Sequence, residues 1–271
     1  IADILFHIRM PELPSSEESF APKTALEPVR NRNFVQFAVA VGLVQFSINL
    51  IAPFQSPWIV NPDAIGAPNT WLGIMYAISQ LTWVLVAPFW GTIMDKWGRK
   101  PVVVLGCFYT LAWTGYFFLT PNSFTFVLPL ISFGAGLLAP AFWEGINQMM
   151  LTLAPQKNRL PYVAWYLAII GIVSAGGSIV GGSLFGLFEG FSLSLGPLSF
   201  SSFHLVQFIA IVMVALSALV ISRVREGSER PLGFVATKLA NPGIIRTYAN
   251  LDYLSGSTNP GRAAQACPWQ S

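Results

Sequence analysis

The sequence predicts an all-α membrane protein whose chain crosses the bilayer six times. Three observations support this fold class: 54% of the 271 residues are hydrophobic, only 10% are charged, and the mean hydropathy is +0.58. A soluble domain carries roughly 25% charged residues, which cover much of the surface that faces water. The composition therefore excludes a soluble globule, a coiled coil and a disordered chain.

The predicted spans are mostly apolar runs, each near the roughly 20 residues that a helix needs to cross the hydrocarbon core. They cover residues 34–54, 71–94, 101–120, 124–153, 162–188 and 202–222. Residues 34–222 thus form a six-helix transmembrane bundle. We expect residues 1–33 to be the end of a preceding span and a cytoplasmic linker, and residues 223–271 to be a largely flexible cytoplasmic tail.

The distribution of basic residues predicts the topology, because Lys and Arg are retained on the cytoplasmic side of a membrane. All 15 of them precede the first span or follow the second, fourth or sixth. The other loops, near 55–70, 121–123 and 189–201, carry only Asp63 and Glu189 as charges. We therefore expect an inner or plasma membrane protein with both termini in the cytoplasm. This bias explains the net charge of +3 without a nucleic-acid partner.

A short charged loop joins the second and third predicted spans and has the residues of a gate. Its sequence is Gly91-Thr-Ile-Met-Asp95-Lys96-Trp-Gly98-Arg99-Lys100. Gly91 would let the second span end close against a neighbour, and Gly98 would permit a tight turn. Asp95 would precede the electropositive N-terminus of the next helix. Arg99 and Lys100 could bridge to carboxylates or helix C-termini across the cytoplasmic face.

This loop resembles the signature G-x-x-x-D-[RK]-x-G-[RK]-[RK] of the major facilitator superfamily, and it matches at every defined position. The resemblance, which covers about residues 30–225, implies one half of a twelve-helix bundle that transports small solutes by alternating access. It also implies that the loop is a conformational gate. The run from Asn33 to Phe54 and the loop from Leu153 to Arg159 look like parts of the family's second half. On this resemblance the spans are family helices seven to twelve, and the missing N-terminal half is a partner.

Polar residues inside the spans are candidates for the substrate or proton path. Glu144 is the one charged residue deep inside a span, where a carboxylate is costly unless it is protonated, paired or hydrated. Asn147 and Gln148 share its helix face, so this face could line a cavity and exchange a proton. Alternatively, Glu144 forms hydrogen bonds within the bundle. Gln45 and Asn49 form a second i, i+4 pair, for which a cavity wall and interhelical hydrogen bonding are equally open.

The fifth span contains glycines at small-xxx-small spacing, namely Gly177 with Gly181 and Gly182 with Gly186. This spacing lets the backbones of two helices approach closely. The pattern is also similar to a glycine motif of the family's antiporters, although Gly177 stands where that motif has proline. We expect the four glycines to serve helix packing.

The sequence favours secondary transport of a small solute, coupled to an ion or a proton, in a lipid bilayer. It lacks a phosphate-binding G-x-x-x-x-G-K-[ST] loop, an H-E-x-x-H motif and Cys/His metal spacing, so we expect no enzyme activity, no metal and no cofactor. The alternative is a membrane scaffold or assembly factor that resembles a transporter but moves nothing.

Overall fold

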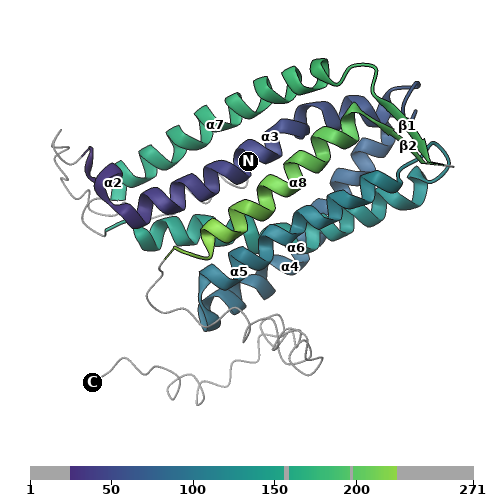
Figure 1. Cartoon of the computed structure of the whole chain (residues 1–271). Helices are drawn as coiled ribbons and strands as arrows, with labels where there is room; N and C mark the ends of the chain where they lie inside the picture. The colour runs from purple at the N-terminus through teal and green to yellow at the C-terminus, as the bar shows by residue number, and fades with distance from the viewer. Residues whose placement is uncertain (1–24, 156–158, 196–197, 225–271) are drawn as a thin grey trace, which may run out of the picture.

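The computed structural model describes residues 25–155, 159–195 and 198–224 (Figure 1). The expected preceding span within residues 1–24 and almost all of the expected C-terminal tail lie outside the described residues. Within the expected linker, residues 27–30 form a short helix, and the first long helix already begins at Arg32.

Helices make up most of the described chain. They are α2 (Glu27–Arg30), α3 (Arg32–Val60), α4 (Thr70–Trp97), α5 (Arg99–Gly106), the 3₁₀ helix η1 (Cys107–Phe118), α6 (Phe124–Leu153), α7 (Arg159–Leu187) and α8 (Ser202–Ile221), with β1 (Ser192–Leu195) and β2 (Leu198–Ser201) before α8. Six of these segments are long and apolar enough to cross a membrane, with α5 and η1 together counted as one. The predicted six-span, all-α architecture is confirmed, and the chain is an integral membrane protein.

Helices α3 and α4 extend beyond the C-terminal ends of the predicted spans. Helix α3 continues to Val60 with Pro53 and Pro57 inside it, and α4 continues to Trp97. Proline is tolerated inside a membrane helix because neighbouring groups satisfy the freed carbonyls. The loop expected near 55–70 is accordingly shortened to residues 61–69.

The bundle is built around two central helices, α3 and α6. Helix α3 packs between α7 and α8, while α6 packs against α4, α5 and η1. Phe37, Val41 and Val44 of α3 share one buried cluster with Phe142 and Ile146 of α6. This apolar cluster joins the two central helices.

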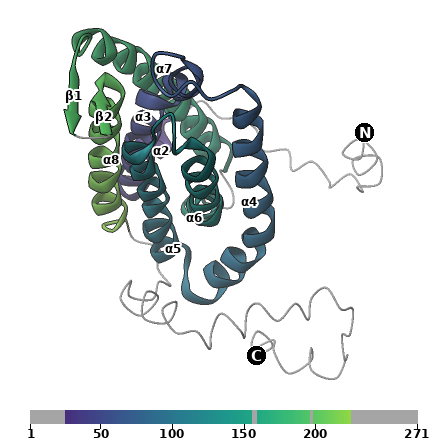
Figure 2. The same ribbon diagram turned by 90° about the vertical axis from the view of Figure 1, so that its right-hand side faces the viewer.

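Helices α4 and α7 are the least covered of the candidate spans in the described structure. Only 11% of the most apolar stretch of each helix is buried, against 61% for α3. Figure 2 shows α4 at the edge of the bundle, with α6 between it and the remaining helices. Both helices therefore present long apolar faces that the described residues leave open.

A two-stranded antiparallel hairpin precedes α8, a feature that the sequence analysis did not predict. Ser192 pairs with Ser201, and Leu193 pairs with Phe200. The hairpin leads directly into α8, where the Nδ1 atom of His204 accepts a hydrogen bond from the backbone N–H of Ser201 at 3.0 Å. His204 thereby caps α8 at the end of the bundle that also holds the loop of residues 61–69.

Candidate functional site

The polar face predicted on α6 lies at the junction of three helices. Gln148 Oε1 accepts a hydrogen bond from Nε of Arg99, the first residue of α5, at 3.4 Å. Asn147 Oδ1 accepts one from the hydroxyl of Tyr166 on α7 at 3.4 Å. Both hydrogen bonds are long, so each is weak in this geometry. The face therefore connects α6 to α5 and to α7.

Glu144 lies one helical turn before Gln148 and is half-buried. Its carboxylate has no hydrogen-bond or ion-pair partner among the described residues, so the alternative of internal hydrogen bonding has no support in this conformation. Asn147, on the same face, is exposed. The α6 face is consequently open at Asn147 and still partly shielded at Glu144.

The predicted gate loop is a sharp turn between two helices. Helix α4 ends at Trp97, and Gly98 follows with φ +94° and ψ 158°, a backbone conformation that essentially only glycine adopts. The Gly98 N–H closes the helix by donating to the carbonyl of Met94 at 3.0 Å. The tight turn expected at Gly98 is therefore present in the structure.

Two other details of the gate loop differ from the expectation. A Cβ atom at Gly91 would have no atom within 4 Å, so this glycine does not mark a close helix contact in the described structure. Asp95 precedes α5 as expected, but it is exposed in the last turn of α4, with Lys96 beside it, and not in a loop after the second span. Helix α4 continues past Asp95, because Gly98 is the first residue that leaves the helical backbone.

Packing between α5 and α6 brings the gate loop and the α6 face together. A Cβ atom at Gly145 of α6 would lie 2.5 Å from Cγ2 of Val103 on α5. At Gly106, a Cβ atom would overlap the backbone of α6 at Phe142. These two glycines allow the close approach that places Arg99 beside Gln148. Neither glycine was predicted from the sequence, and neither was Tyr166, whose hydroxyl group in an apolar run was the available signal.

The second candidate pair, Gln45 and Asn49, lies on α3. Gln45 is buried, and its Oε1 atom has no hydrogen-bond partner among the described residues. The Asn49 amide donates to the backbone carbonyl of Gln45 at 2.8 Å, so this contact stays within the helix instead of joining two helices. The described contacts do not connect this pair with the α6 face.

The glycines of α7 divide into two groups. A Cβ atom at Gly177 would lie 2.6 Å from the carbonyl oxygen of Phe46, and one at Gly181 would overlap the backbone of Leu50. These two positions are where α7 touches α3. Gly182 is only in ordinary contact range of the Phe54 ring, at 3.5 Å, and Gly186 has nothing within 4 Å. The second small-xxx-small pair therefore makes no close helix contact in the described structure.

Comparison with known proteins identifies the family. The model of the Major Facilitator Superfamily matches residues 37–253. Multidrug resistance protein MdtG of Dickeya zeae (strain Ech586) is 27% identical over 140 residues, which cover 50% of this chain and 32% of that protein. The protein of the same name from Rahnella sp. (strain Y9602) is 24% identical over 185 residues, covering 66% of this chain and 42% of its own length.

A third similar protein is Multidrug resistance protein MdtG of Escherichia coli (strain K12 / DH10B), which is 27% identical over 164 residues, covering 59% of this chain and 36% of that protein. The matched regions thus span less than half of the length of these relatives. The family model covers most of the chain, including all six candidate spans except the first turns of α3. The chain belongs to the Major Facilitator Superfamily.

Proposed function

We propose that this chain forms one half of a secondary transporter that moves a small organic solute across the membrane by alternating access. The observation that carries the proposal is the hydrogen bond between Arg99 and Gln148, because it joins the loop motif of the family to the polar face of α6. A gate must be mechanically linked to the site it controls, and in this proposal the contact between Arg99 and Gln148 would provide that link. Family membership supports the same conclusion.

The other half of the transporter would cover α4 and α7. Transporters of this kind consist of repeated bundles that rock against each other around a site near the membrane midplane. The largely open apolar faces of α4 and α7 fit such a partner bundle. We assign the six spans to family helices seven to twelve, on the resemblance of residues 33–54 and 153–159 to that half, and we place both termini in the cytoplasm.

Glu144 is the residue we assign to proton coupling. A half-buried carboxyl group without a partner among the described residues can take up and release a proton as the cavity opens to each side in turn. The negative charge of an ionised Glu144 would also attract a drug-like organic cation, in keeping with relatives named multidrug resistance proteins. Proton antiport follows if the cation and the proton compete for this carboxylate.

The loop motif would act as a lock on one of the two conformations. In this structure Arg99 donates a long hydrogen bond to Gln148, and the turn at Gly98 separates α4 from α5. Rocking of the bundle would break the contact between Arg99 and Gln148 and re-form it in each cycle, which makes the junction a two-state element.

Transport assays in inverted membrane vesicles test this proposal directly. The full protein should accumulate a lipophilic cationic dye when a proton gradient is imposed, and Glu144→Gln should abolish the dependence on that gradient. Glu189→Gln is the matched control, because Glu189 is exposed at the end of the bundle, directly after α7. Unchanged uptake and unchanged pH dependence in Glu144→Gln would refute the coupling role. If the wild-type protein inserts normally into the membrane but shows no flux, the alternative function as a membrane scaffold or assembly factor would be favoured.

A further inference from the structure

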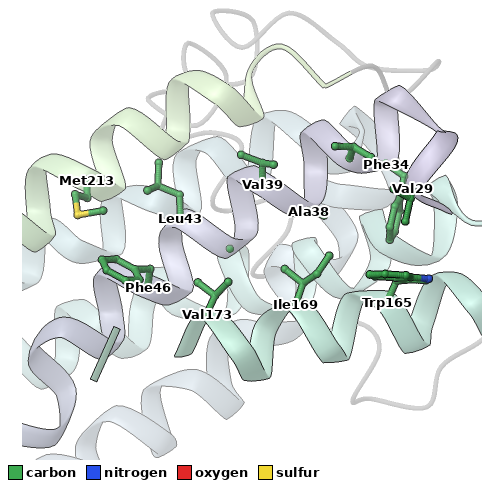
Figure 3. Close-up of a pocket in the computed structure, with 12 residues that line it drawn as sticks. Val29, Phe34, Ala38, Val39, Leu43, Phe46, Trp165, Ile169, Val173 and Met213 are labelled. Carbon is green, nitrogen blue, oxygen red and sulfur yellow. The ribbon is translucent and has the colours of Figure 1, made fainter. Parts of the chain in front are cut away.

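An apolar groove runs along α3, on the side of that helix that faces away from α6. Figure 3 shows it with α7 on one flank and α8 on the other. Its volume is about 660 Å³. Val29 and Trp165 lie at one end of the groove, and Phe46 and Met213 lie at the other. No charged side chain lines the groove. A polar substrate bound there would lose its hydrogen bonds to water without gaining equivalent ones from the protein.

Helix periodicity explains why the groove is open. Val35, Val39 and Gly42 line it at i, i+4 and i+7, whereas Phe37 and Val44 of the same helix pack into the cluster shared with α6. Val39 is 57% exposed, although it lies within a membrane span. The groove is therefore open in the described structure, and it lies on a different side of α3 from the contacts with α6.

The groove has the length of one membrane leaflet. Along α3 it extends from Phe34 to Phe46, which corresponds to about 18 Å at a rise of about 1.5 Å per residue. A single leaflet contributes about half of the roughly 30 Å hydrocarbon core. The groove thus occupies only the half of α3 next to Arg32. An acyl chain of the leaflet on that side of the membrane reaches to the same depth.

Three arginines lie close in sequence to the groove residues at the Val29 end. Arg30 and Arg32 follow Val29 in the chain, Arg159 begins α7 upstream of Trp165, and all three are exposed. Glu27 is the acidic residue of α2 at this end. The indole N–H of Trp165 donates to the carbonyl of Ala25 at 2.7 Å, and tryptophan favours the boundary between hydrocarbon and headgroups. The boundary of the leaflet therefore falls at this end of the groove.

We propose that the groove binds one acyl chain of an anionic phospholipid and that the three arginines contact its phosphate. An acyl chain is the apolar ligand that matches the depth, length and uncharged lining of the groove. Guanidinium groups bind phosphate oxygens with two parallel hydrogen bonds, and basic residues beside a span attract anionic lipids. The result is a specific lipid site, which holds its lipid more firmly than the surrounding bilayer does.

The acyl-chain site is tested by lipid retention. The full protein is incorporated into vesicles of equal parts phosphatidylcholine and phosphatidylglycerol, re-extracted in mild detergent and weighed by native mass spectrometry. The wild-type protein should keep a bound phosphatidylglycerol. Val39→Trp fills the groove and should lower retention several-fold, whereas Leu219→Trp, at an exposed position of α8 that does not line the groove, should not. Equal retention in the wild type and Val39→Trp, or no retained lipid in the wild type, would overturn the site.

The headgroup contact is tested separately with the double substitution of Arg30→Gln and Arg159→Gln. This variant should still retain a phospholipid but should lose the preference for phosphatidylglycerol over phosphatidylcholine. An undiminished preference would overturn the role of the arginines. If removal of residues 1–24 raises lipid retention several-fold, that segment rather than a lipid fills the groove, which would also overturn the proposal.

Discussion

The proposed link between the gate loop and the α6 face depends on one residue, Gln148, whose side chain accepts the hydrogen bond from Arg99. Gln148→Leu removes the acceptor for Arg99. A hydrogen bond to a charged group contributes about 1.5–3 kcal/mol at best, and this one is long, so we expect transport to slow several-fold without loss of protein from the membrane. Efflux rates normalised to the amount of membrane-inserted protein measure the effect.

Two further variants show whether the effect comes from the acceptor itself. Gln148→Glu keeps an oxygen for Arg99 and should retain transport, while Gln80→Leu removes an exposed amide on α4 and should change nothing. Transport by Gln148→Leu at the wild-type rate would disprove the link. The sequence placed Gln148 and Arg99 in separate candidate sets, because nothing in their local patterns indicates that α5 and α6 meet there.

A second residue-scale prediction concerns the turn of the gate loop. Gly98→Ala places a Cβ atom at φ +94°, which costs about 1–3 kcal/mol in this region of backbone conformation. The variant should unfold at a lower temperature and transport more slowly. Gly91→Ala is the matched control within the same motif, because its Cβ atom would meet nothing within 4 Å. Thermal unfolding in detergent compares the two variants, and equal stability would contradict the assigned role of Gly98.

At the scale of helices, the contact between α3 and α7 depends on one pair of glycines. Gly181→Ala would push a methyl group into the backbone of Leu50. Overpacking of this kind costs about 1–3 kcal/mol, so the midpoint of thermal unfolding should fall by several degrees. Gly186→Ala, which has open space, should leave the midpoint unchanged. A similar fall in both variants would contradict the role of close packing at Gly181, because alanine itself favours the helix more than glycine does.

Helix boundaries illustrate what local patterns can predict. The apolar run of residues 124–153 coincides with α6, because its ends are set by Ser123 and Ala154, where apolar sequence and helix stop together. The span predicted at 101–120 instead changes from α-helix to 3₁₀ helix after Gly106. Mean hydropathy does not distinguish these two helix types, since it averages the side chains over a window whatever the number of residues per turn.

At the scale of the whole molecule, the charge distribution predicts which end of the bundle faces the cytoplasm. Asp63 follows α3, and Arg159 begins α7 at the opposite end, where Tyr162 contacts the Asn31 cap of α3. In a variant with Cys107 and Cys267 replaced by serine, Asp63→Cys should react with a membrane-impermeant maleimide in intact cells. Arg159→Cys should react only after the membrane is opened. The reverse pattern would show that the protein has the opposite orientation.

The sequence by itself determined the membrane class, the six spans, the asymmetric charge of the loops and the family motif. The membrane class, the spans and the loop charges depend on whether each segment lies in lipid or in water, which its composition indicates. The family motif is a short, contiguous pattern that is recognised in the sequence directly. Only the tertiary structure decided that Arg99 meets Gln148, that Tyr166 meets Asn147, and that α3 carries a leaflet-length groove. Such contacts join residues from different helices, and in lipid they depend on how closely particular side chains and glycines allow those helices to approach.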